Sequence, residues 1–585
     1  MRLDHASNTM LSTLTLSACL LALPAISSAD PSPSVALEHA NYIFNSVHHA
    51  MRQWGSSLDH NGMSVYLATV PADTEFYHGS SSAWAINGTQ WLAFEPEHAL
   101  NFANCRRPGK GKPSPPGGRP PADERPPHGH IDTQPDKHRD WPDRASEERS
   151  QTAHSRFRDV QEPLVGSVPH LGPDGTRREQ EDANPNAYGP VDPDTSRSDE
   201  EPCAGYLHTY RTLRELRLLY VDGQSAAKSD KGTLDVQDLI LRESGSDQEP
   251  PEHEPGRGPG GPPGDSLRAL ELCNSVDNEW KGKIDGILRM EAGFEVILCS
   301  FEDNLDVVSI KQQKKRQGGG PGSRDSGDQL SYYQAVAARF DGIGGNRVGV
   351  DYDSLISVYA YANSTHLDDA GLPRVTNDST LTGIVREDVR KMLTETEPAA
   401  SAGRVDWQAV TDMIVGRYAI RIASLADGNI TSLLDLQAGI DRALRPFIDY
   451  SNRSTSHEVA RCVEQFLSPA AIASDTTAAV AVRETQRRVC QSLSDAAAAE
   501  TLEEGLVLVR SLRDWLGWTI WKKCVGCLVD EVCMIPIWPW GSKKDRDQPR
   551  CSDMTEGGHG DYWGGFRPGP KNPQRSMAID HAAKN

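Results

Sequence analysis

The sequence predicts an α+β fold in which a mixed, largely antiparallel strand-rich region precedes a mainly α-helical region. Three observations predict it. Short strand-like runs fill the first part of the chain, helical apolar spacing begins near residue 331, and Pro/Gly-rich stretches interrupt the strand-rich part. Because only 37% of the 585 residues are hydrophobic, folded blocks with disordered inserts are a better expectation than one continuous core.

The first 29 residues have the pattern of a secretory signal peptide. A basic residue, Arg2, precedes an apolar run from about Leu11 to Ile26, and the small residues Ser27, Ser28 and Ala29 close the segment. A membrane anchor is the alternative, but this run is short, and no later stretch approaches about 18 uninterrupted apolar residues. The pattern predicts a secreted, extracellular protein without a membrane span.

Cysteines and glycosylation sequons agree with export. Cys19 lies in the leader, and the even number of ten cysteines that remains favours disulfide bonds in an exported chain. Five Asn-x-Ser/Thr sequons are typical of a secreted glycoprotein. The sequon asparagines are Asn87, Asn363, Asn377, Asn429 and Asn452.

Strand-like runs separated by turn residues dominate the segment 30–310. A helix-like stretch at Val35–Arg52 opens it, and a second one is predicted over Ser266–Leu288. Asp303-Asn304 suits a hairpin between the last two predicted strands. The strand candidates are Met63–Val70, Glu75–His78, Trp91–Phe94, Gly205–Tyr220, Gly293–Ser300 and Leu305–Ile310.

Two inserts interrupt this region. The segment 105–202 holds 17 of the 39 prolines and few large apolar side chains, so it cannot bury enough apolar area to offset the entropy of ordering. A disulfide between Cys105 and Cys203 would let this insert loop out from a closed fold. The segment 244–266 is a second Pro/Gly-rich insert.

Helical spacing governs the segment 331–518. Apolar residues from Trp407 to Ile422 fall on one face behind Asp406 as N-cap, and Thr431 is the candidate cap of a helix that ends near Pro446. Further helices are expected at 456–467, 477–496 and 500–518, two of them joined by Cys462 and Cys490. The predicted units are a signal peptide (1–29), an α+β domain (30–310) with disordered inserts (105–202 and 244–266), a linker (311–330), an α-helical domain (331–518), a Cys/Trp-rich module (519–551) and a disordered tail (552–585).

Two candidate metal patterns have simpler interpretations. Cys524, Cys527, Cys533 and Cys551 have a spacing that would indicate zinc in a cytosolic protein, but in a secreted chain a disulfide-bonded module is favoured. The run Glu95–His98 offers adjacent Glu and His side chains that cannot share one helix face, so acidic residues at a helix N-terminus are favoured. No metal site is predicted.

One set of motifs suggests an enzyme active site. His78, Gly79 and Ser80 end a predicted strand, and a second predicted strand carries Trp91, with Phe94 as the alternative aromatic residue, before a helix begins. These motifs, followed by a Glu in the late strand GFEVILCS, resemble the ADP-ribosyltransferase superfamily. In that superfamily a His-Gly-Ser/Thr strand end holds NAD, and a late Glu orients the ribose hydroxyl.

The resemblance implies a site for NAD. It assigns NAD binding to His78, Gly79, Ser80 and Trp91, and catalysis to Glu295, with Glu291 as the alternative. A carboxylate beside the ribose would stabilise the positive charge that develops when the nicotinamide bond breaks. The insert of nearly 100 residues departs from the superfamily pattern. In the alternative interpretation neither residue takes part in a site: His78 is a hydrogen-bonded turn residue and Glu295 is an exposed strand residue.

Several stretches are also similar to a family of large secreted proteins of filamentous fungi, which offers no activity to carry over; they include WGSSLDHNGMS, WLAFEPEHAL, LLYVDGQSAAK and CMIPIWP. The net charge of −21 argues against a nucleic-acid partner, because binding to phosphates requires clustered Lys and Arg. Three functions stay open: an NAD-dependent ADP-ribosyltransferase-like enzyme, a non-catalytic secreted cell-wall or host-interaction protein with an extracellular partner, and a hydrolase with scattered active-site residues.

Overall fold

The structure is a computed structural model, and it describes residues 33–59, 62–103, 204–229, 231–242, 265–314, 326–396, 404–538, 540–555 and 562–563. Several predictions fall outside these residues. They are the leader, the disorder of the insert 105–202, the pairing of Cys105 with Cys203, and most of the insert 244–266, the linker 311–330 and the tail 552–585.

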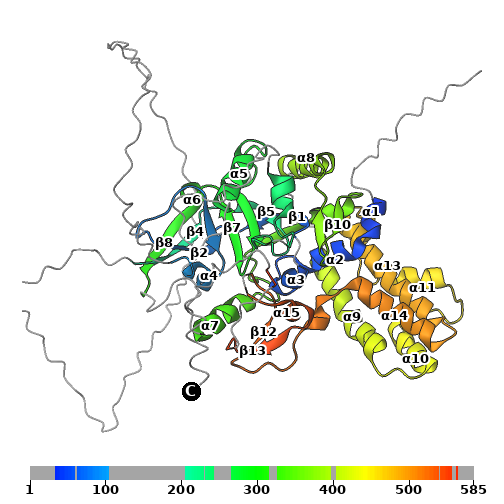
Figure 1. The fold of residues 1–585 in the computed structure, drawn as a ribbon. Coiled ribbons are helices and arrows are strands. Elements are labelled where there is room, and N and C mark those ends of the chain that lie inside the picture. The colour runs from blue at the N-terminus through cyan, green and yellow to red at the C-terminus, as the bar shows by residue number, and fades with distance from the viewer. Residues whose placement is uncertain are drawn as a thin grey trace, which may run out of the picture. The chain divides into compact units, whose positions relative to one another are not determined.

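A nine-stranded sheet lies at the centre of the part of the chain that the structure describes (Figure 1). Its strands follow the order β8-β4-β2-β3-β7-β6-β5-β1-β9, and the pair β5–β6 is parallel whereas the other neighbouring pairs are antiparallel. The strands are β1 (Ser64–Val70), β2 (Glu75–Ser80), β3 (Gln90–Ala93), β4 (Tyr206–Thr212), β5 (Leu216–Val221), β6 (Gly286–Met290), β7 (Phe294–Leu298), β8 (Leu305–Gln312) and β9 (Gly349–Ser357).

The pairing of the last predicted hairpin differs from the sequence-based expectation. All five residues of β7 are buried, and β7 lies between β3 and β6 in the middle of the sheet. However, β8 pairs with β4 rather than with β7. The short helix α6 (Phe301–Asn304), capped by Ser300, takes the place of the predicted turn and carries the chain across to the sheet edge.

Two segments expected to be helical contain strands. The predicted helix Ser266–Leu288 ends early, as α5 (Asp265–Asp277), and its last residues enter β6. The helical region predicted from residue 331 contains β9, which pairs with β1 at the edge of the sheet, and a small hairpin of β10 (Thr365–Leu367) and β11 (Pro373–Val375). Because β9 is an edge strand with half-exposed polar residues, it lacks the continuous apolar run of a buried strand.

Helices cover the sheet and form the C-terminal half. The predicted stripe of α9 is confirmed, since Val410, Ile414 and Tyr418 are buried and Asp406 caps the helix by accepting from Ala409 N. The cap of α10 is Ser432, one residue after the predicted Thr431. The helices are α1 (Pro33–Glu38), α2 (Ala40–His49), α3 (Gln53–Leu58), α4 (Pro96–Leu100), α7 (Ser326–Ala337), α8 (Ser379–Glu395), α9 (Trp407–Asp427), α10 (Leu433–Leu444), α11 (Thr455–Glu464), α12 (Pro469–Ala473), α13 (Thr477–Ala497), α14 (Leu502–Leu516) and α15 (Lys543–Asp547), with the π-helix η1 (Val236–Leu241) and the 3-10 turns η2 (Val358–Ala360), η3 (Arg445–Phe447) and η4 (Thr519–Lys522).

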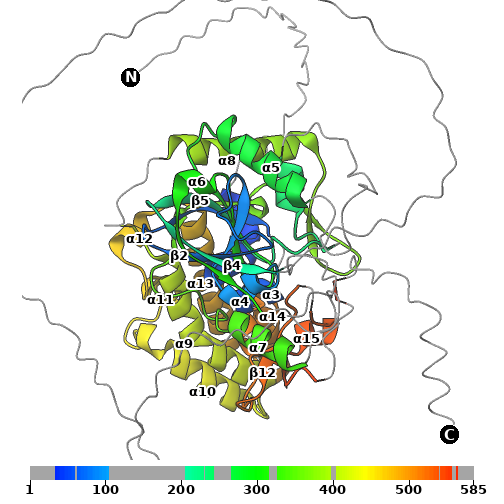
Figure 2. The same cartoon turned by 90° about the vertical axis from the view of Figure 1, so that its left-hand side faces the viewer.

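Helix α2 joins the sheet to the helical half. Asn41 and Asn45 donate from their side-chain amides to the carbonyls of Trp515 and Leu516 at the end of α14, at 2.7 and 3.0 Å. One continuous cluster of buried apolar residues includes side chains of the sheet, α2, α9, α13 and α14. Figure 1 shows α9, α11, α13 and α14 grouped on one side of the sheet, and in Figure 2, turned by 90°, the strands lie in front of them. The strand-rich and helical regions therefore share a core.

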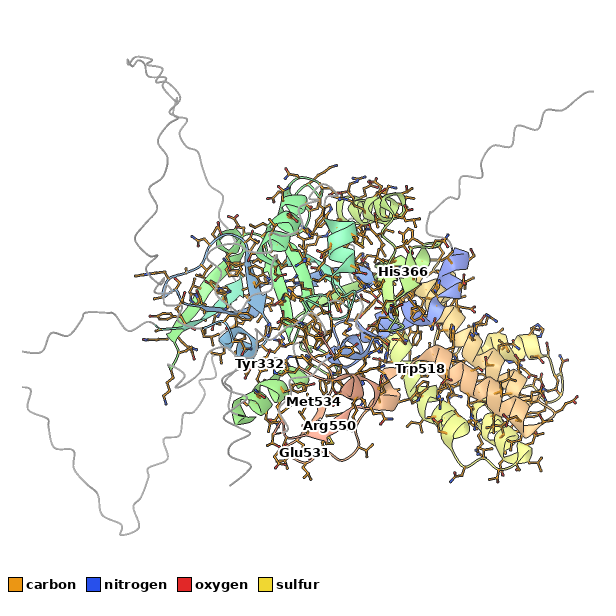
Figure 3. All side chains as sticks on the ribbon, in the orientation of Figure 1. Tyr332, His366, Trp518, Glu531, Met534 and Arg550 are labelled. Carbon is orange, nitrogen blue, oxygen red and sulfur yellow. A yellow bond between two sulfur atoms is a disulfide. The ribbon has the colours of Figure 1, made fainter. Side chains whose placement is uncertain are left out.

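The C-terminal module packs on α7. The rings of Tyr332 and Trp540 lie 5.2 Å apart, and Tyr332 and Met534 belong to one buried cluster (Figure 3). The strands β12 (Val532–Met534) and β13 (Arg550–Ser552) form a small sheet there.

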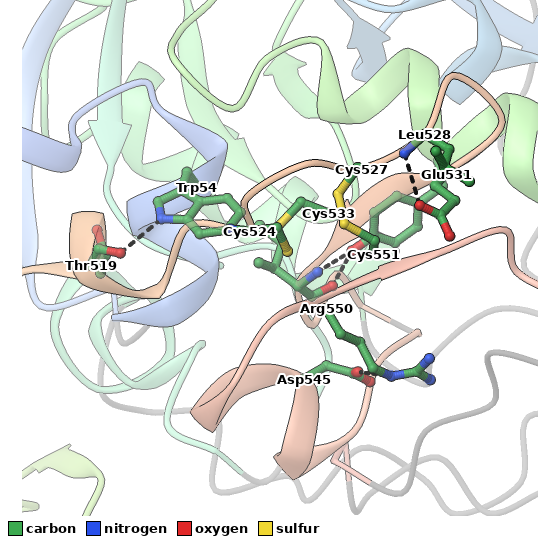
Figure 4. Close-up of a disulfide and its surroundings, with 12 residues drawn as sticks. Trp54, Thr519, Cys524, Cys527, Leu528, Glu531, Cys533, Asp545, Arg550 and Cys551 are labelled. Atoms are coloured by element: carbon green, nitrogen blue, oxygen red, sulfur yellow. Dashed lines mark hydrogen bonds and ion pairs between the residues drawn. A yellow bond between two sulfur atoms is a disulfide. The ribbon is translucent and has the colours of Figure 1, made fainter.

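Four disulfides lie in the described residues. Two of them close the module (Figure 4), which is the disulfide-bonded arrangement that the secreted context predicted. Another joins α11 to α13, as predicted for Cys462 and Cys490. The pairs are Cys273–Cys299, Cys462–Cys490, Cys524–Cys533 and Cys527–Cys551.

Gly79 lets α4 press directly onto β2. A Cβ atom at this position would lie 1.9 Å from the carbonyl oxygen of Ala99 and 2.7 Å from the backbone nitrogen of Ala103. Both atoms belong to backbone and cannot rotate away. The glycine of the predicted His-Gly-Ser motif therefore has a packing role in this structure.

The substitution Gly79→Ala tests this packing. We expect it to lower the free energy of unfolding by about 1–3 kcal/mol, because added volume against backbone forces the helix from the sheet. Gly416→Ala in α9 is the matched control, since a Cβ there meets nothing within 4 Å and alanine is the better helix former. Urea unfolding of both variants gives the comparison. Equal stability of Gly79→Ala and the wild type would contradict the close contact.

Candidate functional site

The strands that carry the predicted NAD site are neighbours in the sheet. Tyr77 in β2 pairs with Ala93 in β3, and Ala93 pairs with Glu295 in β7. Side chains of paired residues leave the same face of a sheet, and successive residues of a strand leave opposite faces. Glu295 therefore lies on the face of Tyr77, and His78 lies on the other face.

The contacts of the predicted residues follow these two faces. The His78 ring packs at 5.7 Å from the ring of Phe301, and its Nδ1–H donates to the Trp91 carbonyl at 2.7 Å. Burial lowers the pKa of His78, which favours the neutral imidazole. Ser80 Oγ accepts from the backbone nitrogen of Ser82 at 3.1 Å. Gly79 and Trp91 are on the face of Glu295, and the structure does not bring His78 and Ser80 to it.

Glu295 takes part in a buried network of charged side chains, which we call the hairpin-tip network. Arg289, directly opposite on β6, donates from Nε to Glu295 Oε1 at 2.8 Å. Arg289 has no exposed surface, and its other nitrogens reach Asp265 at 3.0 Å and Gln237 at 3.1 Å. Burial alone would raise the pKa of Glu295, but Arg289 and Lys228 outweigh burial and lower it to about 2.

Lys228 closes the network on the side of the C-terminal module. Its ammonium donates to Glu291 in the turn of the β6–β7 hairpin and lies 3.6 Å from Asp265. The ammonium also lies 5.4 Å from the ring centre of Trp538. Although burial disfavours a charged amine, the carboxylates of Glu291 and Asp265 raise the pKa of Lys228.

Helix α4 contributes the other side of the network. His98 Nε2 lies 3.7 Å from Glu295 Oε2, and its Nδ1 hydrogen-bonds the Tyr332 hydroxyl at 2.9 Å. Burial lowers the pKa of His98, but Glu295, Glu291 and Glu95 outweigh burial and raise it. Glu95 itself is 1% exposed and accepts from Arg339 Nε at 2.9 Å.

The network pairs buried carboxyls with cations. Glu95, Glu291, Glu295 and Asp265 contact Arg289, Lys228, Arg268, Arg339 and the imidazole of His98. Both oxygens of Glu295 face cations of the protein, and its side chain is 6% exposed. The contacts of Glu295 are therefore those of a structural ion pair. In the described residues, the side chains close enough to share a metal ion are Glu531 and the four cysteines of the C-terminal module, and those cysteines form disulfides.

A separate pocket of about 130 Å³ lies beside α2. Asp222 reaches it from the end of β5, where its oxygens accept from Ser46 Oγ at 2.6 Å and from the backbone nitrogen of Ser64 at 3.0 Å. Asp59 lies at its rim, 3.6 Å from His49 Nδ1. Burial raises the pKa of both aspartates to about 6.

Sequence reasoning missed this pocket. Its residues come from α2, α3, the loop before β1, the turn after β5, η2, the β10–β11 hairpin and α15, and they form no local motif. In the sequence, Asp222-Gly223 has only the pattern of a turn. The pocket therefore could not be predicted from the sequence, because its lining residues come together only in the folded chain.

The substitution Glu295→Gln tests the structural role of this carboxylate. We expect a loss of about 3–5 kcal/mol in the free energy of unfolding, because Arg289 would stay buried without its full countercharge. Glu387→Gln is the control: it removes a carboxylate of a surface pair with Arg390 and should leave the unfolding midpoint unchanged. If both variants unfold at the same denaturant concentration, the hairpin-tip network is not holding the fold.

The protonation of His98 predicts a pH dependence of stability. A group whose pKa is raised on folding contributes stability below its unfolded pKa, about 6.5, and this contribution disappears as the pH rises through the folded value. The stability difference between the wild type and His98→Gln should therefore shrink as the pH rises above about 6.5 and through the raised pKa of the folded protein. The exposed His457→Gln is the control, and denaturant titrations at several pH values measure the difference. A constant difference would show that His98 is neutral in the folded protein.

Comparisons with known proteins give relatives without a described activity. Residues 33–170 and 166–318 match the family model described as the YPL277C N-terminal domain. The uncharacterized protein YPL277C of Saccharomyces cerevisiae is 25% identical over 465 residues, which cover 69% of this chain and 79% of that protein. The uncharacterized protein YOR389W of the same yeast is 28% identical over 286 residues, which cover 47% of this chain and 34% of that protein.

No solved structure matches the chain. None of these relatives is described as an ADP-ribosyltransferase. The segment that matches the family model carries eight of the nine strands of the sheet, from β1 to β8, together with the residues of the hairpin-tip network that precede α7. By this segment the chain is similar to an uncharacterised family.

Proposed function

We propose that this chain is an exported, disulfide-bonded glycoprotein that acts by recognising an extracellular partner and not by NAD chemistry. The observation that carries the proposal is the placement of the sequons. All five sequon asparagines are exposed and lie outside helices and strands, where an oligosaccharyltransferase and its glycan have room. They are Asn87, Asn363, Asn377, Asn429 and Asn452.

The disulfides also support an extracellular location. Disulfides persist in oxidising environments, and two of the four crosslink the C-terminal module, whose core is small. A typical disulfide adds about 2–4 kcal/mol by restricting the unfolded chain. The helices of the described residues include none that is long and apolar enough to cross a membrane.

The NAD-dependent transferase stays a prediction of the sequence motifs. Its two main residues, His78 and Glu295, leave opposite faces of the sheet, and Glu295 is engaged by Arg289 and His98. These contacts favour the recognition function over the enzyme.

Glycan mapping of the exported protein tests the proposal. We expect mass shifts at the sequon asparagines after secretion from a eukaryotic host, and loss of the shift at Asn363 alone in Thr365→Ala, which leaves the asparagine in place. Calorimetry with NAD should show no binding. Secretion of an unmodified chain would contradict the glycoprotein, and NAD binding that Glu295→Gln abolishes would restore the enzyme.

A further inference from the structure

The two most exposed aromatic residues of the described part of the chain lie shortly before sequon asparagines. Trp84 is 81% exposed and precedes Asn87 by three residues, and Tyr450 is 61% exposed and precedes Asn452 by two. We propose that each ring is the stacking surface for the first sugar of the glycan on the asparagine that follows it. This inference rests on the glycoprotein of the proposed function and adds the protein groups that hold two of its glycans.

Such exposure is unusual for large aromatic rings, because Trp is highly buried on average in folded proteins. The other exposed aromatic residues that the structure describes already pack on rings of the protein: Tyr42 on Tyr359, and Phe102 on His98. Water solvates the face of an exposed ring poorly, so a partner that covers it is stabilising. A sugar can cover the face of Trp84 with its C–H groups while its hydroxyls stay in water.

The loop between β2 and β3 fixes the backbone around the first pair. Ser82 Oγ accepts from the backbone nitrogen of Trp84 at 3.1 Å and donates to the Trp84 carbonyl at 3.0 Å. After Asn87, the backbone nitrogen of Gly88 donates to the Glu302 carboxylate at 2.7 Å. Three residues span at most about 11 Å, which the side chains of Trp84 and of a glycosylated Asn87 can close together. Because the backbone is already held, stacking orders little additional chain.

The second pair lies in the turn between η3 and α11. The backbone nitrogen of Asn452 donates to the Asp449 carbonyl at 3.2 Å, which closes a turn that contains Tyr450. The Tyr450 hydroxyl donates to Asp441 Oδ1 at 2.8 Å, and the Arg453 guanidinium lies 5.7 Å from the ring centre. A ring has two faces, so a cation over one leaves the other for a sugar. These contacts hold the ring in place although it is largely exposed.

The other three sequons have no exposed aromatic residue at the corresponding positions. Tyr361 precedes Asn363 by two residues, but it is 4% exposed. The three positions before Asn377 and before Asn429 hold no aromatic residue. Exposed rings therefore accompany particular sequons and are not a requirement of every glycosylation site in this chain.

Hydroxyl-radical footprinting of the full chain, secreted from a eukaryotic host and analysed by peptide mass spectrometry, tests the contact. Oxidation is followed on the fully glycosylated chain, on the chain trimmed to one N-acetylglucosamine at each site, and on the chain freed of N-glycans. We expect Trp84 and Tyr450 to be oxidised about half as fast in the first two forms as in the third, because a stacked sugar covers one of two ring faces. Tyr42 and Phe102 are the controls and should be oxidised equally in all three forms.

Asn87→Gln and Asn452→Gln are matched variants, because each removes one glycan and keeps the other. Asn87→Gln should restore fast oxidation at Trp84 alone, and Asn452→Gln should restore it at Tyr450 alone. Equal oxidation of Trp84 with and without a glycan that mass spectrometry detects on Asn87 would overturn this inference and leave the glycoprotein standing. Protection that disappears on trimming to one sugar would also overturn it. Absence of a glycan from all five sequons would overturn both proposals.

Discussion

The pairing of buried charges at the tip of the β6–β7 hairpin is the constraint on which this structure depends. Arg289 has no exposed surface, and an unpaired guanidinium in that position would cost several kcal/mol. Its countercharges come from β7 and from the first turn of α5, so both elements must be in place together. The same network reaches α4 through His98 and the loop after β5 through Lys228. Segments separated by long inserts are thus joined by electrostatics as well as by apolar packing.

Two small residues make this arrangement possible. Gly79 allows α4 to touch β2, which brings His98 within reach of Glu295. Gly293, in the turn of the hairpin, leaves room for Glu95, since a Cβ there would lie 2.7 Å from Glu95 Oε2. The glycines that sequence reasoning associates with ligand approach or turns therefore serve to place charged side chains in the interior. The network and the pocket beside α2 are distinct: the first pairs charged side chains in the interior, and the second is a cavity of about 130 Å³.

The helical half is part of the same core, and it shapes the surface that an extracellular partner would meet. Helix α2 binds α14 through Asn41 and Asn45, and Tyr42, Asn45, Ser46 and His49 of the same helix line the pocket. Strand β9, which follows α7 in the chain, returns to the edge of the sheet beside β1. The exposed sequon asparagines are distributed over loops of both halves.

The sequence by itself determined the local elements. Apolar spacing predicted β1, β7 and α9, and cysteine spacing in an exported chain predicted a disulfide-bonded module, because periodicity and redox chemistry act over short distances. It also singled out Glu295, but as a catalytic residue. Only the tertiary structure decided that β8 pairs with β4, that β9 is a strand, and that Glu295 meets Arg289 and His98 while His78 faces away. Strand order and side-chain faces depend on register between segments more than 100 residues apart, and no local pattern encodes the partner that a buried charge will find.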